Sequence, residues 1–315
     1  MPENICGVSR ATVSYVLNND TRQSIPPQTR EKVLKAAQEL GYSPFAPARI
    51  LRVGYSRIVL VVLQFEQVDP SLAHDLKALE EGLAAHGFTL LWHVGLHTSP
   101  GQLHPSANLT PAVIVSYSYV DEADTQMASF LRQFNVPVLS LNNESYRQSV
   151  GKTQATYLVQ QGWRRMVFAA PERRDVQRLA QARLDGVRQA CTEAGLEPPL
   201  VQTIPHSREK AREAIANLLT QQAFPCGICC YNDEVAFAVI AALTDAGIEI
   251  PTSAAVIGCD DIPLAQFSNP PLTTISFDNR LSYQRLIENI LAASQGEALQ
   301  PALPVPLTVI RRASA

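Results

Sequence analysis

Long apolar runs are missing from this 315-residue sequence, and no stretch approaches the roughly 20 residues that a membrane-spanning helix requires. The first residues, MPENICGVSR, lack the basic segment and apolar core of a secretory signal. Cysteines are few and scattered, at positions 6, 191, 226, 229, 230 and 259, which is typical of reduced thiols rather than a disulfide framework. These absences argue against a membrane or secreted protein and predict a cytoplasmic one.

Signatures of catalysis and nucleotide binding are also missing, since the sequence contains neither GxSxG nor GxGxxG. The segment SVGKTQ resembles a phosphate-binding loop, but Tyr146 stands where that loop needs its first glycine. Cys226, Cys229 and Cys230 fall in a short apolar stretch typical of a strand, in which adjacent side chains point to opposite faces. We interpret them as small packing residues, with zinc ligation as the less favoured alternative. We therefore expect no catalysis, no metal and no cofactor.

Charge is sparse and unevenly distributed. Charged residues make up 17% of the chain and hydrophobic residues 46%, which is typical of a globular protein. The length of 315 residues predicts two or three compact units. Residues 1–55 hold seven basic and four acidic side chains, giving +3, so the remainder carries -6 of the net -3. A basic segment attached to an acidic body favours a nucleic-acid-binding module joined to a second function.

Residues 7–19, GVSRATVSYVLNN, predict a short helix that begins after a turn glycine and an N-cap serine, Ser9. One face carries the apolar residues, which are Val8, Ala11, Val13, Val16 and Leu17. The other face carries hydrogen-bonding side chains without an acidic group, which are Arg10, Thr12, Ser14, Tyr15 and Asn18. This combination favours the recognition helix of a helix-turn-helix over an ordinary amphipathic surface helix.

A second helix is predicted from Pro27, with Val33, Leu34, Ala37 and Leu40 on one buried face and Gly41 as its C-terminal stop. The Pro-punctuated segment SPFAPARILR follows, which fits either a linker or one short helix.

From residue 57 onward, strand-like and helix-like segments alternate about every 25 residues, which is typical of doubly wound α/β structure. The predicted strands are 57–65, 88–94, 111–117, 136–142, 164–170, 200–204, 226–230 and 254–259. The predicted helices are 69–87, 128–135, 149–163, 175–195, 207–222 and 233–247. This length suffices for two subdomains, and ligands of such sheets bind at the carboxyl ends of the strands.

Two acidic segments follow consecutive predicted strands, YNDE at 231–234 and GCDD at 258–261. Asn232 or Asp233 would cap the next helix, and both segments are also placed to accept hydrogen bonds from a ligand in a cleft. Capping alone is the alternative interpretation.

The stretches GVSRATVSYVLNN, TREKVLKAAQELGYSP and APARILR, in that order, resemble the head of the LacI/GalR family of bacterial transcriptional regulators. CYNDEVAFAVIAALTDAGIEIPTSAAVIGCDDIPLAQFSNPPLTTISFD and PLTVIRRAS resemble that family's core and closing segment. The resemblance implies a small all-α helix-turn-helix head (1–43) and a hinge (44–55). It also implies an α/β core of two doubly wound, periplasmic-binding-protein-like subdomains (56–315) that binds an effector and dimerises. A homodimer on a palindromic operator is implied as well.

The resemblance also implies site residues. Ser9, Thr12, Ser14 and Asn18 would hold phosphates, Arg10, Ala11 and Tyr15 would face base edges, and Leu51 would enter the minor groove. The implied effector contacts are Asn142, Arg183, Asn232 and Asp260. An arginine fork with an aspartate and an asparagine suits a neutral, hydroxyl-rich effector such as a sugar better than an anion. A purine-like effector is the runner-up, with Phe65 or Tyr231 as stacking partner.

The chain departs from the family pattern in its head and hinge. The family head begins with a helix of the type LKDVARLA, where this sequence has PENIC, and Phe45 replaces the usual hinge asparagine. Two functions are therefore weighed. The favoured one is an effector-controlled transcriptional regulator, a repressor of a catabolic or transport operon. The alternative is a small-molecule binding protein without a DNA role.

Overall fold

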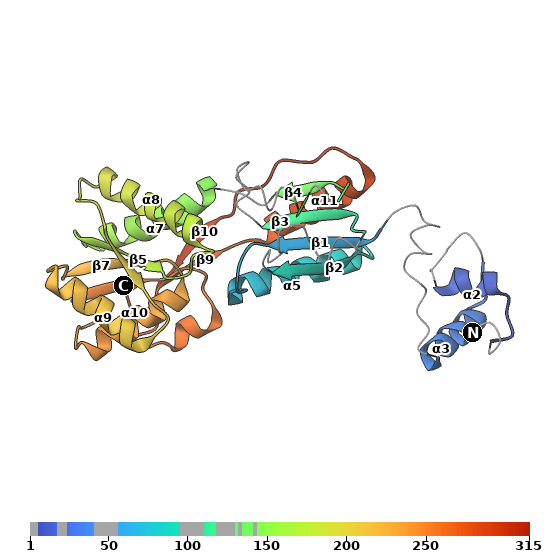
Figure 1. The fold of residues 1–315 in the computed structure, drawn as a ribbon, viewed down its shortest axis with the longest axis horizontal. Helices are drawn as coiled ribbons and strands as arrows, with labels where there is room; N and C mark the ends of the chain where they lie inside the picture. Colours follow the sequence, from blue (N-terminus) through green and yellow to red (C-terminus); the bar gives the residue numbers. More distant parts are fainter. Residues whose placement is uncertain are drawn as a thin grey trace. The chain divides into compact units, whose positions relative to one another are not determined.

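The computed structural model describes residues 6–17, 24–40, 56–94, 110–117, 130–131, 134–140 and 144–315. These residues belong to two compact units, 1–56 and 57–315, each of which is described by itself. Figure 1 shows both units and labels most of their elements. The predicted hinge (44–55) and the predicted site residues Asn18, Leu51 and Asn142 lie outside the described residues.

The N-terminal unit contains helices α2 (Arg10–Leu17) and α3 (Pro27–Glu39). Both helices were predicted, and they share a small core of Val13, Val16 and Val33. The predicted buried face of α3 is partly wrong, because Leu34 and Leu40 are 48% and 44% exposed. The face that packs on α2 is rotated toward the small side chains, so that Val33, Ala36 and Ala37 are the buried residues of α3.

The first lobe of the larger unit is a four-stranded parallel sheet of order β2-β1-β3-β4. The strands are β1 (Ile58–Leu63), β2 (Thr89–Val94), β3 (Val113–Tyr117) and β4 (Val138–Ser140). Helix α5 (Pro70–Ala85) and helix α11 (Arg280–Gln295) pack together on one face of this sheet. β1 is buried on both faces, as its uninterrupted β-branched run predicts.

The second lobe is a parallel sheet of order β6-β5-β7-β8. Its strands are β5 (Met166–Pro171), β6 (Leu200–Ile204), β7 (Cys226–Cys230) and β8 (Ala254–Ile257). Helices α7 (Glu144–Gln160) and α8 (Gln177–Glu193) pack together, and so do α9 (Arg208–Thr220) and α10 (Asp233–Asp245). In Figure 1 the two pairs cover opposite faces of the sheet. The predicted doubly wound fold is thereby confirmed for both lobes.

The segments after β8 were not predicted as elements. They are the 3₁₀ helix η2 (Pro263–Phe267), strand β9 (Thr274–Phe277), helix α11 and strand β10 (Leu307–Ile310). β9 and β10 form an antiparallel ribbon. Leu286, Ile290 and Ala293 of α11 complete the core of the first lobe, although they are far from it in sequence.

Helix α7 begins at Glu144, earlier than predicted, so the GKT segment lies within the helix rather than at its start. Lys152 pairs there with Glu193 of α8 at 2.7 Å. Among the described residues, no helix combines the length and apolarity of a membrane span.

Candidate functional site

A cleft of about 550 Å³ is lined by residues of both lobes. Its walls include residues at the carboxyl ends of parallel strands, where β1 and β3 of the first lobe and β7 and β8 of the second lobe end. In each sheet the strand order reverses beside β1 or β5, which is the position where doubly wound sheets bind ligands. Four residues that the sequence analysis named for the effector line it, namely Phe65, Arg183, Tyr231 and Asp260.

Arg183 enters the cleft from α8, whose position is set by a close crossing with α7. A Cβ added at Gly151 of α7 would lie 1.8 Å from the Arg183 carbonyl oxygen. A Cβ added at Gly186 of α8 would lie 1.9 Å from the carbonyl oxygen of Gln148. Both glycines are therefore required by backbone-to-backbone contact, and this contact fixes the point from which the Arg183 side chain extends.

Arg183 is only 7% exposed, and its guanidinium contacts both Tyr231 and Asp260. Nη1 donates to the carbonyl oxygen of Tyr231, and Cζ lies 4.7 Å from the centroid of the Tyr231 ring. Nη2 lies 3.8 Å from Oδ1 of Asp260, an ion pair longer than a direct hydrogen bond. Arg183 covers one face of the Tyr231 ring, and Tyr231 is only 4% exposed, so the half-buried Phe65 is the better of the two predicted stacking partners.

Asp260 stands on a turn with a φ of 111°, in the region that non-glycine residues rarely adopt. Its amide donates to the carbonyl oxygen of Ile275 at 2.9 Å, which anchors the turn to β9. Burial raises the pKa of Asp260 to about 6, while the positive charge of Arg183 opposes that shift. The carboxyl group therefore changes charge close to neutral pH and can either accept or donate a hydrogen bond.

Asn232 is not among the residues that line this cleft, and its predicted contact with the effector stays a prediction. It is the N-cap of α10, and its side-chain oxygen accepts from the Val235 amide at 2.9 Å. A short polar side chain directly before a helix can accept a hydrogen bond from the unpaired amides of the first turn, and the Asn232 oxygen does so here.

Asp233 is fully buried behind the strand ends and joins three segments. Oδ2 accepts from the Ile262 amide at 2.9 Å, and Oδ1 accepts from the Thr274 hydroxyl at 2.5 Å. Burial raises the pKa of Asp233 to about 7, with these hydrogen bonds acting in the opposite direction. The residue supports the floor of the cleft rather than lining it.

The first-lobe wall contains polar residues that the sequence did not single out, including Asp75, Asn279 and Tyr283. Asp75 of α5 has side-chain hydrogen bonds with Tyr283 and Asn279, and its burial raises its pKa. Tyr283 belongs to α11 and Asn279 directly precedes it, and no sequence pattern placed that helix against α5. The spacing of these residues therefore carried no signal that could have identified them.

The two lobes are also joined beside the cleft. Arg173, which follows β5, pairs with Asp69 at the start of α5 and donates to the carbonyl oxygen of Gln67 at 3.3 Å. Asp175 pairs with Arg173 at 2.6 Å and accepts from the Glu66 amide at 2.8 Å. These bonds connect the loop after β1 with the loop after β5, so they depend on the relative position of the lobes.

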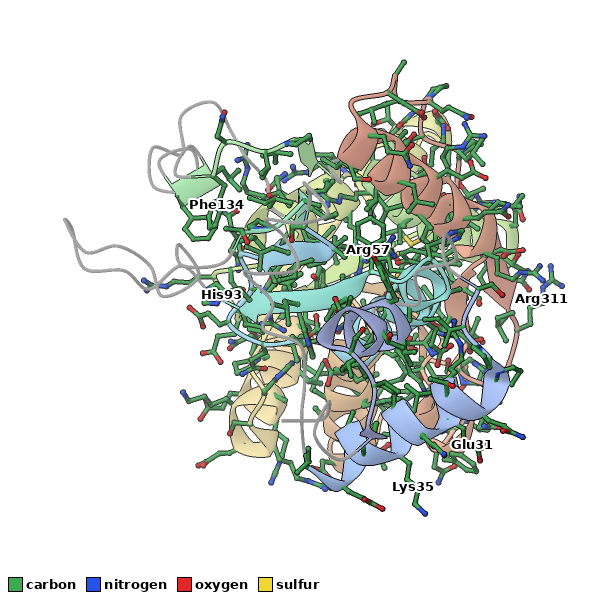
Figure 2. All side chains as sticks on the ribbon, turned by 90° about the vertical axis from the view of Figure 1, so that its right-hand side faces the viewer. Glu31, Lys35, Arg57, His93, Phe134 and Arg311 are labelled. Atoms are coloured by element: carbon green, nitrogen blue, oxygen red, sulfur yellow. The ribbon has the colours of Figure 1, made fainter. Side chains whose placement is uncertain are left out.

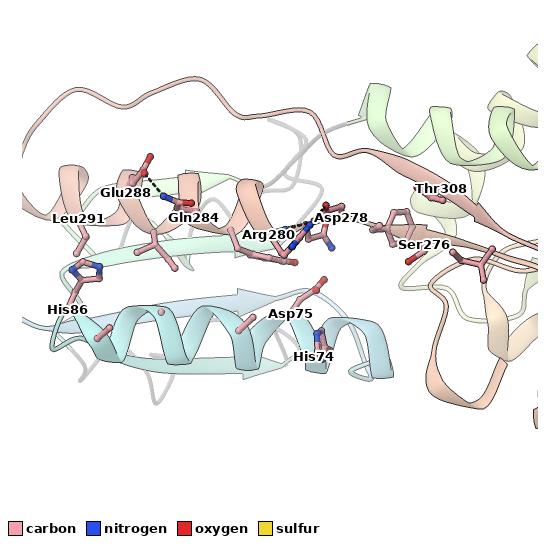
Figure 3. Close-up of a pocket in the computed structure, with 18 residues that line it drawn as sticks. His74, Asp75, His86, Ser276, Asp278, Arg280, Gln284, Glu288, Leu291 and Thr308 are labelled. Atoms are coloured by element: carbon pink, nitrogen blue, oxygen red, sulfur yellow. Dashed lines mark hydrogen bonds and ion pairs between the residues drawn. The ribbon is translucent and has the colours of Figure 1, made fainter. Parts of the chain in front are cut away.

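A second hollow, of about 1010 Å³, runs between α5 and α11 toward the β9–β10 ribbon (Figure 3). Its charged side chains include Arg280 paired with Asp278 at 2.8 Å, and Gln284 donates to Glu288 at 3.4 Å. None of the predicted effector residues lines this hollow.

The predicted recognition helix is formed by α2. Ser9 caps it, because its hydroxyl oxygen accepts from the Thr12 amide at 3.1 Å, and the Ser9 and Thr12 hydroxyl groups lie 2.9 Å apart. Ala11 is exposed, while Ser14 and Tyr15 are partly exposed. Of Arg10 only the backbone is described, as the first residue of α2. On α3, Glu31 and Lys35 extend outward from the helix (Figure 2).

Comparison with known families identifies both parts of the chain. Residues 155–315, about half of the chain, match the family described as periplasmic binding protein-like domain. The chain belongs to this periplasmic binding protein-like family. Residues 5–44 match the bacterial regulatory proteins of the lacI family. The resemblance to the LacI/GalR regulators is thereby confirmed.

The relatives that match most of this chain are named as repressors. The chain is 28% identical to the HTH-type transcriptional repressor PurR of Glaesserella parasuis serovar 5 (strain SH0165), over 97% of this chain and 92% of the relative. It is also 28% identical to the HTH-type transcriptional repressor CytR of Escherichia coli (strain K12), over 85% and 81%.

Solved structures share the fold. The Lac repressor dimer bound to operator and the anti-inducer ONPF superimposes with a TM-score of 0.80 at 22% identity, covering 99% of this chain and 97% of that one. The complex of the transcriptional regulator CelR with cellobiose gives a TM-score of 0.70 at 23% identity, covering 100% and 98%.

Proposed function

We propose that this chain is an effector-controlled, DNA-binding transcriptional repressor that acts in the cytoplasm as a homodimer. The observation that carries the proposal is the combination of a lacI-type head with a cleft between two lobes in one polypeptide. The two named relatives, which match 97% and 85% of this chain, are transcriptional repressors. The proposal assigns no catalysis to the cleft.

The head binds an operator through α2. The exposed face of α2 offers hydroxyl groups to phosphates, with Ser9, Thr12 and Ser14 as the donors. Arg10, Ala11 and Tyr15 face base edges in the major groove, where arginine recognises guanine best. Asn18 adds a phosphate contact, and Leu51 of the hinge enters the minor groove. Two heads in a dimer then read a palindromic operator, because operator symmetry mirrors protein symmetry.

The effector is a neutral, hydroxyl-rich molecule such as a sugar. Arg183 supplies donors, and Asp260 supplies an acceptor on the same side of the cleft. The first-lobe wall adds a second carboxylate, Asp75. Two carboxylates disfavour an anionic ligand, and their oxygens accept from hydroxyl groups. The CelR structure, which contains cellobiose, is consistent with this assignment. A purine-like effector is the second candidate, favoured by the half-buried Phe65 ring.

The coupling between effector and operator works through the lobes. An effector that contacts Arg183 on one lobe and Phe65 on the other favours one relative position of the lobes. The position of the two first lobes in a dimer then sets the spacing of the hinges. A coupling free energy of about 1–3 kcal/mol is sufficient for such a switch.

The test is calorimetry with glucose, cellobiose, adenine and cytidine on the wild type and on Asp260→Ala. Loss of a hydrogen bond to a charged group costs about 1.5–3 kcal/mol, so the dissociation constant should rise about 10- to 100-fold. Asp261→Ala is the matched control, because Asp261 pairs with Arg312 at 2.7 Å and does not line the cleft. Equal binding by wild type and Asp260→Ala would place the effector site elsewhere.

A further inference from the structure

Gln154 of α7 is fully buried beneath the cleft and makes a set of contacts that the proposed function does not use. Its Nε2 donates to the carbonyl oxygens of Cys230 at 2.9 Å and Gly258 at 2.8 Å, and lies 3.4 Å from that of Ile257. Only the NH₂ end of the amide can face several carbonyl oxygens, so the orientation of the side chain is fixed chemically. Its Oε1 has no hydrogen-bond partner among the described residues.

These carbonyl groups lie at the point where the pairing between β7 and β8 ends. The ladder between β7 and β8 ends at the pair Cys229 and Ile257. Cys230 and Gly258 each come one residue later, so one side chain spans the two strand ends beyond their last pair. Tyr231 follows Cys230 directly, and Asp260 follows Gly258 by two residues. Both line the cleft and both contact Arg183.

The same helix also places Arg183. Gly151 lies one turn before Gln154 on α7, and it is in contact with the backbone of Arg183. Helix α7 therefore sets the position of three second-lobe residues of the cleft, one through a glycine contact and two through a side-chain amide.

We propose that Gln154 is a positioning residue of the cleft, whose amide holds the ends of β7 and β8 so that Tyr231 and Asp260 face Arg183. The inference rests on the proposed function only in assigning effector binding to the cleft. Effector affinity thereby depends on a residue that touches no effector.

Asp233 of α10, on the opposite face of the sheet from α7, makes a second set of hydrogen bonds near the ends of β7 and β8. The Asp233 amide of α10 donates to the carbonyl oxygen of Cys259 at 2.9 Å, and Oδ2 accepts from the Ile262 amide. Loss of the Gln154 hydrogen bonds leaves those of Asp233 in place, so a Gln154 variant is expected to fold. Its effect should be confined to the two strand ends.

The decisive variant is Gln154→Met, which keeps the length of the side chain and removes its donors. Gln148→Met is the matched control, because Gln148 lies on the same helix and its Nε2 donates to Gln189 at 3.3 Å, away from the strand ends. Hydrogen exchange is measured at the amides of Tyr231, Asp233, Gly258 and Asp260, which are bonded to Ala169, Cys259, Thr273 and Ile275. We expect about tenfold faster exchange there in Gln154→Met, with α9 and β6 unchanged, and no change in Gln148→Met.

Calorimetry with glucose, cellobiose, adenine and cytidine forms the second arm. A compound that binds the wild type should bind Gln154→Met about tenfold more weakly, with Gln148→Met unaffected. Unchanged exchange at the four amides would overturn the role of Gln154, and so would faster exchange spread evenly over the second lobe. If none of the four compounds binds the wild type, the effector assignment fails while the exchange result still decides the role of Gln154.

Discussion

At the scale of single residues, the cleft holds a buried arginine and a buried aspartate that a long ion pair joins. Arg183 and Asp260 are mostly buried, yet Nη2 and Oδ1 are 3.8 Å apart. A buried ion loses its hydration, and close ion pairs and hydrogen bonds offset that cost. A ligand that hydrogen-bonds both Arg183 and Asp260 would therefore be stabilised in the cleft. Asp233, directly behind them, is a carboxyl group that burial drives toward its neutral form.

Asp233 predicts a specific pH dependence of stability. Burial raises its pKa from 3.8 to about 7. Between these two values the folded chain holds a proton that the unfolded chain releases. Stability therefore falls as pH rises through this window, and the loss is complete above the folded pKa. Asp260, whose pKa is raised to about 6, acts in the same direction.

Asp233→Asn should reduce the drop in Tm between pH 5.5 and pH 8. Asparagine mimics the neutral acid, because its amide donates to Thr274 and its oxygen accepts from Ile262. Each kcal/mol recovered corresponds to roughly 2–4 °C for a domain of this size. Asp245→Asn is the control, since Arg208 lowers the pKa of Asp245 below 3.8 and out of this window. An undiminished drop in Asp233→Asn, measured by calorimetric melting, would contradict the assignment.

At the scale of elements, helix α2 is a short helix that depends on its cap and its packing for stability. It has eight residues, too few for a stable isolated helix, so the Ser9 cap and the core with Val33 must hold it. Because the apolar side is used by this core, the polar side stays partly exposed, where the proposed DNA contact needs it.

Helix α2 predicts two different effects of substitution on DNA binding. Arg10→Ala or Tyr15→Ala should lower the preference among operator variants by about 1–3 kcal/mol, because base contacts carry sequence information. Ser14→Ala should weaken all sequences by a similar factor, because a phosphate contact carries none. The measurement is fluorescence anisotropy over a set of operator variants at one salt concentration. An unchanged ranking of operators for Arg10→Ala would show that the helix is placed in the wrong register.

At the scale of the whole molecule, two exposed apolar side chains of η2 bear on the proposed dimer. Leu264 and Phe267 of η2 are 61% and 75% exposed, although both are large and apolar. Positions i and i+3 of a 3₁₀ helix share a face, so the two side chains form one patch. Exposed apolar patches mark interaction surfaces, and a second copy of this chain is the partner that the proposed function requires.

The chain is therefore expected to be a dimer at micromolar concentration, and Phe267→Asp should shift it toward monomer in light scattering. Leu219→Asp is the control, because Leu219 is 46% exposed on α9 and lies outside η2. A monomeric wild type, with and without DNA, would exclude the proposed dimer. Dissociation by both variants alike would indicate loss of folding rather than loss of an interface.

The sequence alone determined the local structure. The alternation of apolar runs with amphipathic segments specified the strands β1 to β8. The signal was clearest for central strands such as β1, because a strand buried on both faces must be continuously apolar. Ser9 and Gly7 marked the start of α2. Arg183 and Asp260 were singled out from the resemblance, and the position of Asp260 after a strand agreed with it.

What only the tertiary structure decided depends on contacts between distant segments. Helix α11 was missed although Leu286, Ile290 and Ala293 recur at helical spacing. That spacing could not show that the helix packs on the first lobe and brings Asn279 and Tyr283 to the cleft. Asn232 could cap a helix, meet a ligand or do both, and the structure shows the cap while the ligand contact stays a prediction. The role of Gln154 depends on two strand ends that lie 76 and 104 residues from it in the chain. Sequence spacing cannot reveal such a bond, because it forms only when a helix packs across the ends of both strands.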